Sequence, residues 1–271
     1  MRSAWRLALA IFAGRVWRVS ADLVPDELWD RIAPFLPPRQ ERRAASSVSA
    51  DCRHRARRIS RVVGVRDVRV VLIGGTSNVG KSTIAQEVAE EFGFECLSTD
   101  ALARHPGRPW RTSDWEVPAH VAEHYGSLTV NELITSVFDH YDRLWPRIEE
   151  LITARAAEDS GSTGLVLEGS ALWPARVARL QVPHTAAVWL TTDDSLVRAR
   201  VHSAGCYEAA TDEERVLMDK FLARTERYQA LMIEAIDRLG LARIDAGGGQ
   251  CAAELADIVL AAVDTQTALG R

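Results

Sequence analysis

Short apolar runs alternate with longer segments of helical periodicity from residue 68 to the end of the chain. The apolar runs predict strands at residues 68–74, 94–99, 164–169, 186–191 and 242–245. The periodic segments predict helices at residues 81–92, 130–157, 195–202, 212–239 and 250–268. Strands buried on both faces of a parallel sheet have such near-continuous apolar sequences, and helices usually connect them. We therefore expect an α/β fold built on a parallel sheet.

Residues 1–67 differ from the rest of the chain in charge as well as in pattern. They carry 14 arginines and 7 acidic residues, a net charge of +7, whereas residues 68–271 carry 19 basic and 30 acidic residues, a net charge of −11. We therefore expect a poorly packed basic N-terminal extension (residues 1–67) followed by one main domain (residues 68–271). The acidic charge of the main domain argues against nucleic acid as its partner.

Within the extension, residues 19–43 contain the sequence DELWDRIAPFLPP, which predicts a short helix that ends at Pro37 and Pro38. This segment resembles the N-terminal fragment of a family of bacterial insertion-element transposases. No downstream region supplies the acidic nuclease triad of such an enzyme. Residues 44–67 are rich in serine, alanine and arginine, which predicts a solvated linker, with contact to nucleic acid or a membrane as the alternative.

The chain has four cysteines that are far apart in the sequence: Cys52, Cys96, Cys206 and Cys251. Their spacing fits neither a disulfide framework nor a zinc site, so we expect a reduced, cytoplasmic protein. The apolar residues 7–14 are followed by Arg15 and Arg18 and by no convincing cleavage site, so we expect no signal peptide. No apolar stretch is long enough to cross a bilayer, and we expect no membrane partner.

The first predicted strand runs into a complete phosphate-binding motif, G-x-x-x-x-G-K-S, which opens a predicted helix. In such a loop the glycines allow close backbone approach, backbone N–H groups surround phosphate oxygens, Lys81 neutralises the β- and γ-phosphates and the Ser82 hydroxyl binds Mg²⁺. Lys81 is one of only two lysines among 33 basic residues, which makes a chance match a poor explanation. The sequence thus predicts Mg²⁺ and ATP as cofactors. The predicted ATP-binding residues are Gly75, Thr76, Ser77, Asn78, Val79, Gly80, Lys81, Ser82 and Thr83.

Two acidic residues lie at the carboxyl ends of predicted strands, where ligands bind in open α/β sheets. Asp100 follows the second strand, and we expect it to bind the substrate hydroxyl and accept its proton, with a helix N-cap as the alternative. Glu168 ends the third strand, as expected of a carboxylate that acts on Mg²⁺ directly or through water. Binding of substrate by Glu168, or a surface position at the strand end, is the alternative.

Arginines of the helical part are candidates to stabilise the negative charge that phosphoryl transfer spreads over the migrating group. Arg198 and Arg224 are the predicted catalytic arginines, and Arg200 cannot face the same way as Arg198 on a straight helix. Solvated helix faces are the alternative for each of them. Arg104, one turn after Asp100, and Arg108 are predicted to bind the substrate, with a solvated position on a helix as the alternative for Arg104.

The segment between Arg104 and Val130 is rich in proline, glycine and tryptophan, and we expect it to shape the acceptor pocket, with Trp110 among its contacts. His120 and His124 are four residues apart, a spacing that metal-binding pairs use. The motif H-E-x-x-H is absent, so we do not assign a metal to them.

Together these motifs resemble the P-loop small-molecule kinases, a group that includes 2-phosphoglycerate kinase-like proteins and nucleotide and antibiotic phosphotransferases. The resemblance is carried by GGTSNVGKST, STD-x-x-x-R, LEGS and WLTTDD-x-x-x-R-x-R. It implies a three-layer fold with a five-stranded parallel sheet of order 2-3-1-4-5, helices on both faces, Mg-ATP as phosphoryl donor and a small-molecule acceptor. The nucleotide-specific signatures of adenylate and thymidylate kinases are absent, which argues against a nucleotide acceptor.

Two other functions stay open. One is an ATP-binding regulator or toxin-like kinase that acts on a cellular partner, and the other is a transposase-derived DNA-binding protein. The sequence lacks the N-K-x-D motif of common GTPases and the L-S-G-G-Q motif of transporter ATPases, which excludes those two classes. Neither the acceptor nor the oligomeric state is indicated.

Overall fold

The computed structural model describes residues 7–12, 15–20, 67–103, 107–112, 116–157 and 163–269, which divide between two compact units. The first unit contains an antiparallel hairpin of β1 (Leu7–Phe12) and β2 (Arg15–Ser20), and the sequence pattern does not predict these strands. The transposase-like segment 19–43 lies outside the described residues except for the end of β2, and the linker 44–67 except for its last residue. The transposase resemblance therefore gains no support, and the loose packing of residues 1–67 stays a prediction.

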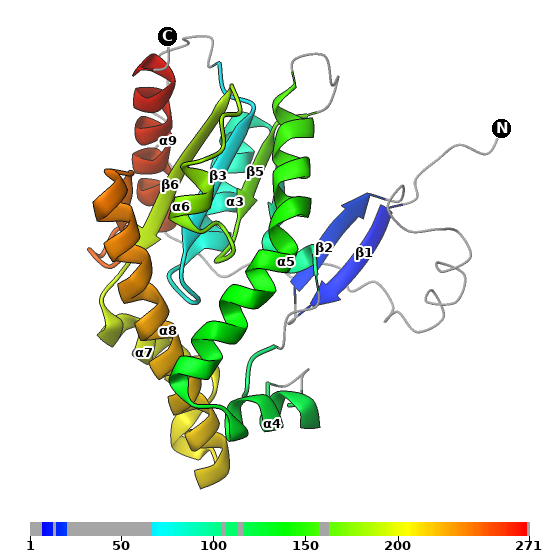
Figure 1. The fold of residues 1–271 in the computed structure, drawn as a ribbon, viewed down its shortest axis with the longest axis vertical. Coiled ribbons are helices and arrows are strands. Elements are labelled where there is room, and N and C mark those ends of the chain that lie inside the picture. Colours follow the sequence, from blue (N-terminus) through cyan, green and yellow to red (C-terminus); the bar gives the residue numbers. More distant parts are fainter. Residues whose placement is uncertain are drawn as a thin grey trace, which may run out of the picture. The chain divides into compact units, whose positions relative to one another are not determined.

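The second unit is built on a five-stranded sheet, of which Figure 1 labels β3, β5 and β6. Its strands are β3 (Val70–Gly75), β4 (Glu95–Ser98), β5 (Leu165–Glu168), β6 (Thr185–Thr191) and β7 (Arg243–Asp245). All neighbouring strands are parallel, in the spatial order β4-β5-β3-β6-β7. Counted within this sheet, the order is 2-3-1-4-5, which confirms the predicted topology.

Helices surround the sheet. They are α3 (Lys81–Phe92), α4 (Ala119–Ser127), α5 (Val130–Ala156), α6 (Pro174–Val177), α7 (Asp194–Ala204), α8 (Asp212–Leu239) and α9 (Ala252–Leu269), with short 3-10 turns η3 (Thr99–Ala101) and η5 (Tyr207–Ala209). The sequence pattern predicts α3, α5, α7, α8 and α9 to within two residues at each end and misses α4 and α6. Within the described ranges, no helix combines the length and apolar character that crossing a membrane requires.

The side chains of β3 alternate between two buried apolar layers. Val71 and Ile73 belong to the cluster that the sheet forms with α3 and α9. Val70 and Leu72 belong to the cluster formed with α5 and α8. This period of two places one layer of helices on each face of the sheet and confirms the predicted three-layer arrangement.

The two long helices begin at capping boxes. The hydroxyl of Thr129 accepts a hydrogen bond from the N–H of Glu132, whose carboxylate accepts one from the N–H of Thr129. Thr211 and Glu214 form the same pair at the start of α8. Each box satisfies N–H groups that a helix start leaves without partners. Both helices extend past the carboxyl ends of the strands, where α4 and α7 also lie (Figure 1).

A third apolar cluster joins α4 and α7 to the first halves of α5 and α8. Trp110 is 1% exposed in this cluster, and its ring meets the Phe221 ring edge-on at a centroid distance of 4.9 Å. The expectation that Trp110 contacts the substrate is therefore wrong, because its ring is used in packing. This cluster gives the helices beyond the sheet a core of their own.

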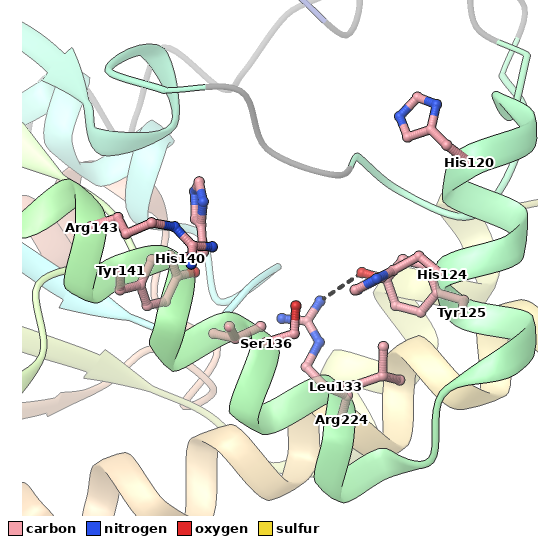
Figure 2. A pocket seen from close by; sticks show the side chains of 10 residues that line it. His120, His124, Tyr125, Leu133, Ser136, His140, Tyr141, Arg143 and Arg224 are labelled. Atoms are coloured by element: carbon pink, nitrogen blue, oxygen red, sulfur yellow. Dashed lines mark hydrogen bonds between the residues drawn. The ribbon is translucent and has the colours of Figure 1, made fainter.

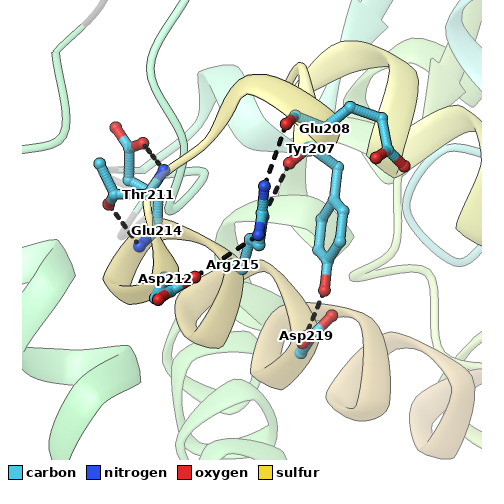
Figure 3. Close-up of polar contacts among 7 residues, drawn as sticks. All are labelled: Tyr207, Glu208, Thr211, Asp212, Glu214, Arg215 and Asp219. Atoms are coloured by element: carbon cyan, nitrogen blue, oxygen red, sulfur yellow. Dashed lines mark hydrogen bonds and ion pairs between the residues drawn. The ribbon is translucent and has the colours of Figure 1, made fainter.

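The connection from α7 to α8 is held by Arg215 in the first turn of α8 (Figure 3). Its guanidinium donates to the carbonyl oxygens of Tyr207 at 3.1 Å and Glu208 at 3.0 Å. The Tyr207 hydroxyl in turn donates to Asp219 Oδ2 at 3.0 Å. These bonds fix the position of α7, which carries Arg200, relative to α8.

Candidate functional site

The loop between β3 and α3 has a backbone that favours glycine. Gly75 and Gly80 have φ of 137° and 102°, and Asn78 has φ of 64°, so all three lie in the left-handed region. A Cβ atom at Gly75 would also lie 2.5 Å from the carbonyl oxygen of Leu190 in β6. The loop leads directly into the N-terminus of α3, where N–H groups and the helix dipole favour an anion. The conformation therefore fits a bound phosphate.

Lys81 begins α3, and its side chain is buried against the loop. Its Nζ donates to the carbonyl oxygen of Thr76 at 2.7 Å and to the hydroxyl of Ser170 at 3.5 Å. Burial lowers the pKa of Lys81, and the carboxylates of Glu168 and Asp100 oppose this shift. Removed from water, the ammonium group attracts a phosphate more strongly than an exposed lysine does.

The next residue, Ser82, contacts the end of the neighbouring strand. Its hydroxyl donates to Oε1 of Glu168 at 3.0 Å. Glu168 is 3% exposed, and burial raises the pKa of its carboxyl, opposed mainly by the charge of Lys81. Hydroxyl and carboxylate oxygens are ligands that Mg²⁺ accepts, usually one or two from the protein beside phosphates. Ser82 and Glu168 therefore fit the predicted Mg²⁺ site.

Asp100 lies in η3, beyond the end of β4, with its side chain exposed. Its N–H donates to Ser98 Oγ at 3.3 Å, so Ser98 caps this turn and Asp100 does not. The negative charge of Asp100 raises the pKa of both Lys81 and Glu168, against burial in the first case and with it in the second. The structure thus brings Lys81, Glu168 and Asp100 into one electrostatic cluster.

Glycine after Glu168 makes this arrangement possible. A Cβ atom at Gly169 would lie 1.8 Å from Oγ1 of Thr99, the residue before Asp100. The ends of β4 and β5 can therefore approach each other only with glycine at this position. The glycine of the LEGS sequence at the end of β5 therefore has a steric explanation, which the sequence spacing does not reveal.

The arginines of α7 have different surroundings. Arg200 donates through Nη1 to the carbonyl oxygen of Asn78 at 2.8 Å, so it contacts the phosphate-binding loop. Arg198, the predicted catalytic residue, pairs instead with Glu226 at 2.6 Å, and 52% of its side chain is exposed. The sequence does not indicate which face of α7 meets the loop, and therefore does not distinguish Arg198 from Arg200. The arginine that the structure brings to the loop is Arg200.

Of the two arginines predicted to bind substrate, the structure describes only Arg108. Arg104 lies outside the described residues. The guanidinium of Arg108 lies 5.8 Å from the centroid of the Trp110 ring. Its charge contributes, after burial, to the lowered pKa of Lys81. Of the remaining loop residues, Thr76 and Val79 are buried, Ser77 is half-buried and Thr83 is exposed.

A pocket of about 340 Å³ lies between α4, α5 and α8 (Figure 2). The residues that line it are His120, His124, Tyr125, Leu133, Ser136, Val137, His140, Tyr141, Arg143 and Arg224. Sequence reasoning singles out three of them, His120, His124 and Arg224. The others share no motif, and only the packing of three helices brings them together.

The pocket is connected to the phosphate-binding loop. The Tyr141 ring packs against the Tyr228 ring, whose hydroxyl donates to the carbonyl oxygen of Ser170 at 2.6 Å. The Ser170 hydroxyl in turn accepts from Lys81 Nζ. The charge of Asp100 acts on both His140 and Tyr141. Asp100 therefore acts electrostatically on residues of both the loop and the pocket.

Within the described part of the chain, no group of three or more His, Cys, Asp and Glu residues is arranged to hold a metal ion. His120 and His124 both line the pocket.

No protein-family model and no curated protein sequence matches this chain. Among solved structures, it is similar to a gluconokinase from Sinorhizobium meliloti 1021, with 16% identity over 74% of this chain and 95% of that chain and a TM-score of 0.43. A sugar kinase from Janibacter sp. HTCC2649 has 20% identity over 74% and 97% of the two chains and a TM-score of 0.44. Shikimate kinase from Acinetobacter baumannii has 15% identity over 74% of this chain and 96% of that chain, with a TM-score of 0.36.

The compared proteins are small-molecule kinases. Their identities to this chain are at most 20% and their TM-scores are below 0.5, so neither the activity nor the acceptor of this chain follows from the similarity.

Proposed function

We propose that this protein is an ATP-dependent phosphotransferase that moves the γ-phosphate of Mg-ATP to a hydroxyl group of a small molecule. The observation that chiefly supports this is the 3.0 Å contact between Ser82 and Glu168, with the charges of Lys81 and Asp100 beside it. A phosphate-binding loop, a pair of Mg²⁺ ligands and a carboxylate that accepts a proton are the parts that phosphoryl transfer needs.

Ser82 and Glu168 would hold Mg²⁺, which when bound neutralises negative charge on the β- and γ-phosphates. Lys81 binds the same phosphates from the start of α3. The acceptor oxygen attacks the γ-phosphorus, the bond from that phosphorus to the β–γ bridging oxygen breaks, and ADP leaves. Asp100 accepts the proton of the acceptor hydroxyl. Arg200 maintains the loop conformation through the carbonyl oxygen of Asn78.

The pocket supports transfer to a small molecule rather than to a macromolecule. Its volume of about 340 Å³ lies at the lower end of the range of ligand pockets, which suits an acceptor smaller than a typical drug. Two of its lining residues, His140 and Tyr141, feel the charge of Asp100, which supports Asp100 as the base for an acceptor bound there.

The full chain, assayed for ADP formation with Mg-ATP, tests this function. Hydroxylated acids, sugars and antibiotics are offered as acceptors, and Lys81→Ala is the control. We expect at least one acceptor to stimulate ADP formation in the wild type and not in the variant. A protein that binds ATP but forms no ADP with any acceptor would contradict the proposal. A growth defect that depends on Lys81 would favour a toxin-like kinase instead.

We further propose that residues 68–271 form the catalytic domain and that the basic extension, residues 1–67, is dispensable for binding Mg-ATP. The described elements that form the loop and the pocket all lie within residues 68–271.

A further inference from the structure

A buried arginine lies in the wall of the pocket without an opposite charge. Arg224 is 3% exposed, its Nη2 donates to the Tyr125 hydroxyl at 3.2 Å, and its guanidinium lies 4.6 Å from the centroid of the Phe221 ring. Nε has no hydrogen-bond partner, and no ion pair with Arg224 occurs among the residues that the structure describes. Burying a charge without a partner is costly. An anion that enters the pocket would remove this cost.

The remaining polar lining is positive or neutral. Arg143 lines the pocket from α5, and none of the described lining residues is acidic (Figure 2). Burial and then the charge of Arg224 lower the pKa of His124. Burial and then the charge of Arg143 lower the pKa of His140, while Asp100 opposes this shift. Both histidines thus lie in a positive field produced by the two arginines.

Lys220, one turn earlier on α8, is a cation with a structural role and contrasts with Arg224. Its Nζ donates to the carbonyl oxygens of Gly126 at 2.8 Å and Leu128 at 3.0 Å, so it closes the C-terminal end of α4. Arg224 has no such backbone acceptors in the described structure, and its neighbours Tyr125 and Phe221 bear no charge. A purely structural role does not explain why the buried Nε of Arg224 lacks a hydrogen-bond partner.

We propose that the acceptor carries an oxyanion, either a carboxylate or a phosphate, and that Arg224 binds this group with Arg143 contributing from the rim. The inference rests on the proposed function for the hydroxyl that is phosphorylated. The planar guanidinium suits both oxyanions, because its N–H groups can donate to two oxygens at once. With its anionic group at Arg224 and its hydroxyl toward Asp100, the acceptor is a small hydroxy acid or a phosphorylated sugar or polyol.

Binding of matched probes to the full chain tests this inference. The phosphate-binding loop is first saturated with a non-hydrolysable ATP analogue and Mg²⁺, so that the probes cannot bind there. Two series are compared by calorimetry: glycerol, glycerate and glycerol 3-phosphate, and then sorbitol, gluconate and glucose 6-phosphate. We expect the anionic members of at least one series to bind ten or more times more tightly than its neutral member, on the order expected for a charged hydrogen bond. The better anion identifies the oxyanion as carboxylate or phosphate.

The variants decide which residue is responsible. Arg224→Gln is expected to weaken anion binding by roughly 10- to 100-fold, and Arg224→Lys to weaken it less, because the charge is kept. Arg227→Gln, an exposed arginine one turn later on α8 and outside the pocket lining, is the matched control and should change binding by less than about twofold. If Arg224→Gln does not fold, Arg143→Gln, at an exposed position, should still weaken anion binding selectively, by roughly fivefold.

Equal or undetectable binding of anionic and neutral probes overturns the inference, as does unchanged anion binding in both the Arg224 and Arg143 variants. Arginine-dependent anion binding without phosphoryl transfer to any acceptor overturns the proposed function alone. Phosphorylation of a neutral acceptor with the same KM in the wild type and in Arg224→Gln overturns the inference alone.

Discussion

The hydroxyl of Ser82 donates a 3.0 Å hydrogen bond to Oε1 of Glu168, which joins the first turn of α3 to the end of β5. In the sheet, Glu168 pairs in register with Ile73, two residues before Gly75. The contact is a consequence of the strand order, because an adjacent parallel strand ends beside the loop. Asp100 follows β4 on the other side of β5. Three neighbouring strands therefore carry the candidate site.

Replacing Lys81 by methionine is expected to abolish ATP turnover and to stabilise the nucleotide-free protein by about 1 kcal/mol, or roughly 2–4 °C in Tm. Burial lowers the pKa of Lys81, so the fold disfavours its charged form, and methionine has a similar shape without the charge. The difference should shrink as the pH rises and the wild-type lysine loses its proton. Calorimetry without nucleotide measures it, and a lower Tm of the variant at neutral pH would contradict the account.

Glu168→Gln is expected to gain stability relative to the wild type as the pH increases from about 4 to 8. Burial raises the pKa of Glu168, so the folded protein holds this proton more tightly than the unfolded chain does. The stability that this carboxyl contributes is fully present below its unfolded pKa and is lost as the pH rises through its folded pKa. Glutamine cannot ionise, so the variant does not lose stability at this position as the pH rises.

Urea unfolding at several pH values measures this effect, with the exposed Glu149→Gln on α5 as control. A stability difference between Glu168→Gln and the wild type that does not change with pH would show that burial does not affect this carboxyl as described.

Arg200→Gln is expected to weaken ATP binding about tenfold, because it removes a charged donor to the carbonyl oxygen of Asn78, which has φ of 64°. Arg198→Gln removes a half-exposed ion pair with Glu226 and should weaken ATP binding less than about threefold. Isothermal titration with an ATP analogue compares the two. A larger loss of ATP affinity in Arg198→Gln than in Arg200→Gln would favour Arg198, the arginine predicted from the sequence.

A truncated chain of residues 68–271 is expected to fold and to bind Mg-ATP with an affinity within about threefold of the full chain. The reason is that the loop, its supporting strands and the pocket all lie in this range. Circular dichroism and titration with an ATP analogue check both properties. A truncated chain that fails to fold or to bind would assign a role to residues 1–67 and revive the transposase-derived interpretation.

The sheet could be predicted from sequence because parallel strands are buried on both faces. Val70 to Ile73 and Leu165 to Leu167 are all at most 1% exposed, so each strand reads as an uninterrupted apolar run. The long helices were predictable from their periodicity, and the structure adds the capping boxes that begin them, such as Thr129 with Glu132. Helix α4 was missed because it follows a proline-rich segment and has only two buried residues, Val121 and Tyr125.

The loop and its carboxylates could be predicted because they follow strand ends, whose side of the sheet is determined by the parallel topology. The pocket could not be predicted from the sequence. Arg224 faces it only because of the angle at which α8 passes α4 and α5, and neither the spacing of Arg224 nor its residue type distinguishes it from Arg227. In the same way, the contact of Arg200 with the loop depends on how α7 packs against α8.

In the proposed reaction, the γ-phosphate of ATP is transferred to a hydroxyl of a small molecule. The most direct measurement follows the label from ATP labelled at the γ-phosphate, incubated with Mg²⁺, the full chain and the anionic acceptors that bind. We expect the label to appear in an organic phosphate only when an acceptor is present, and not with Lys81→Ala. Label found only in inorganic phosphate, or only on the protein, would contradict the proposed reaction.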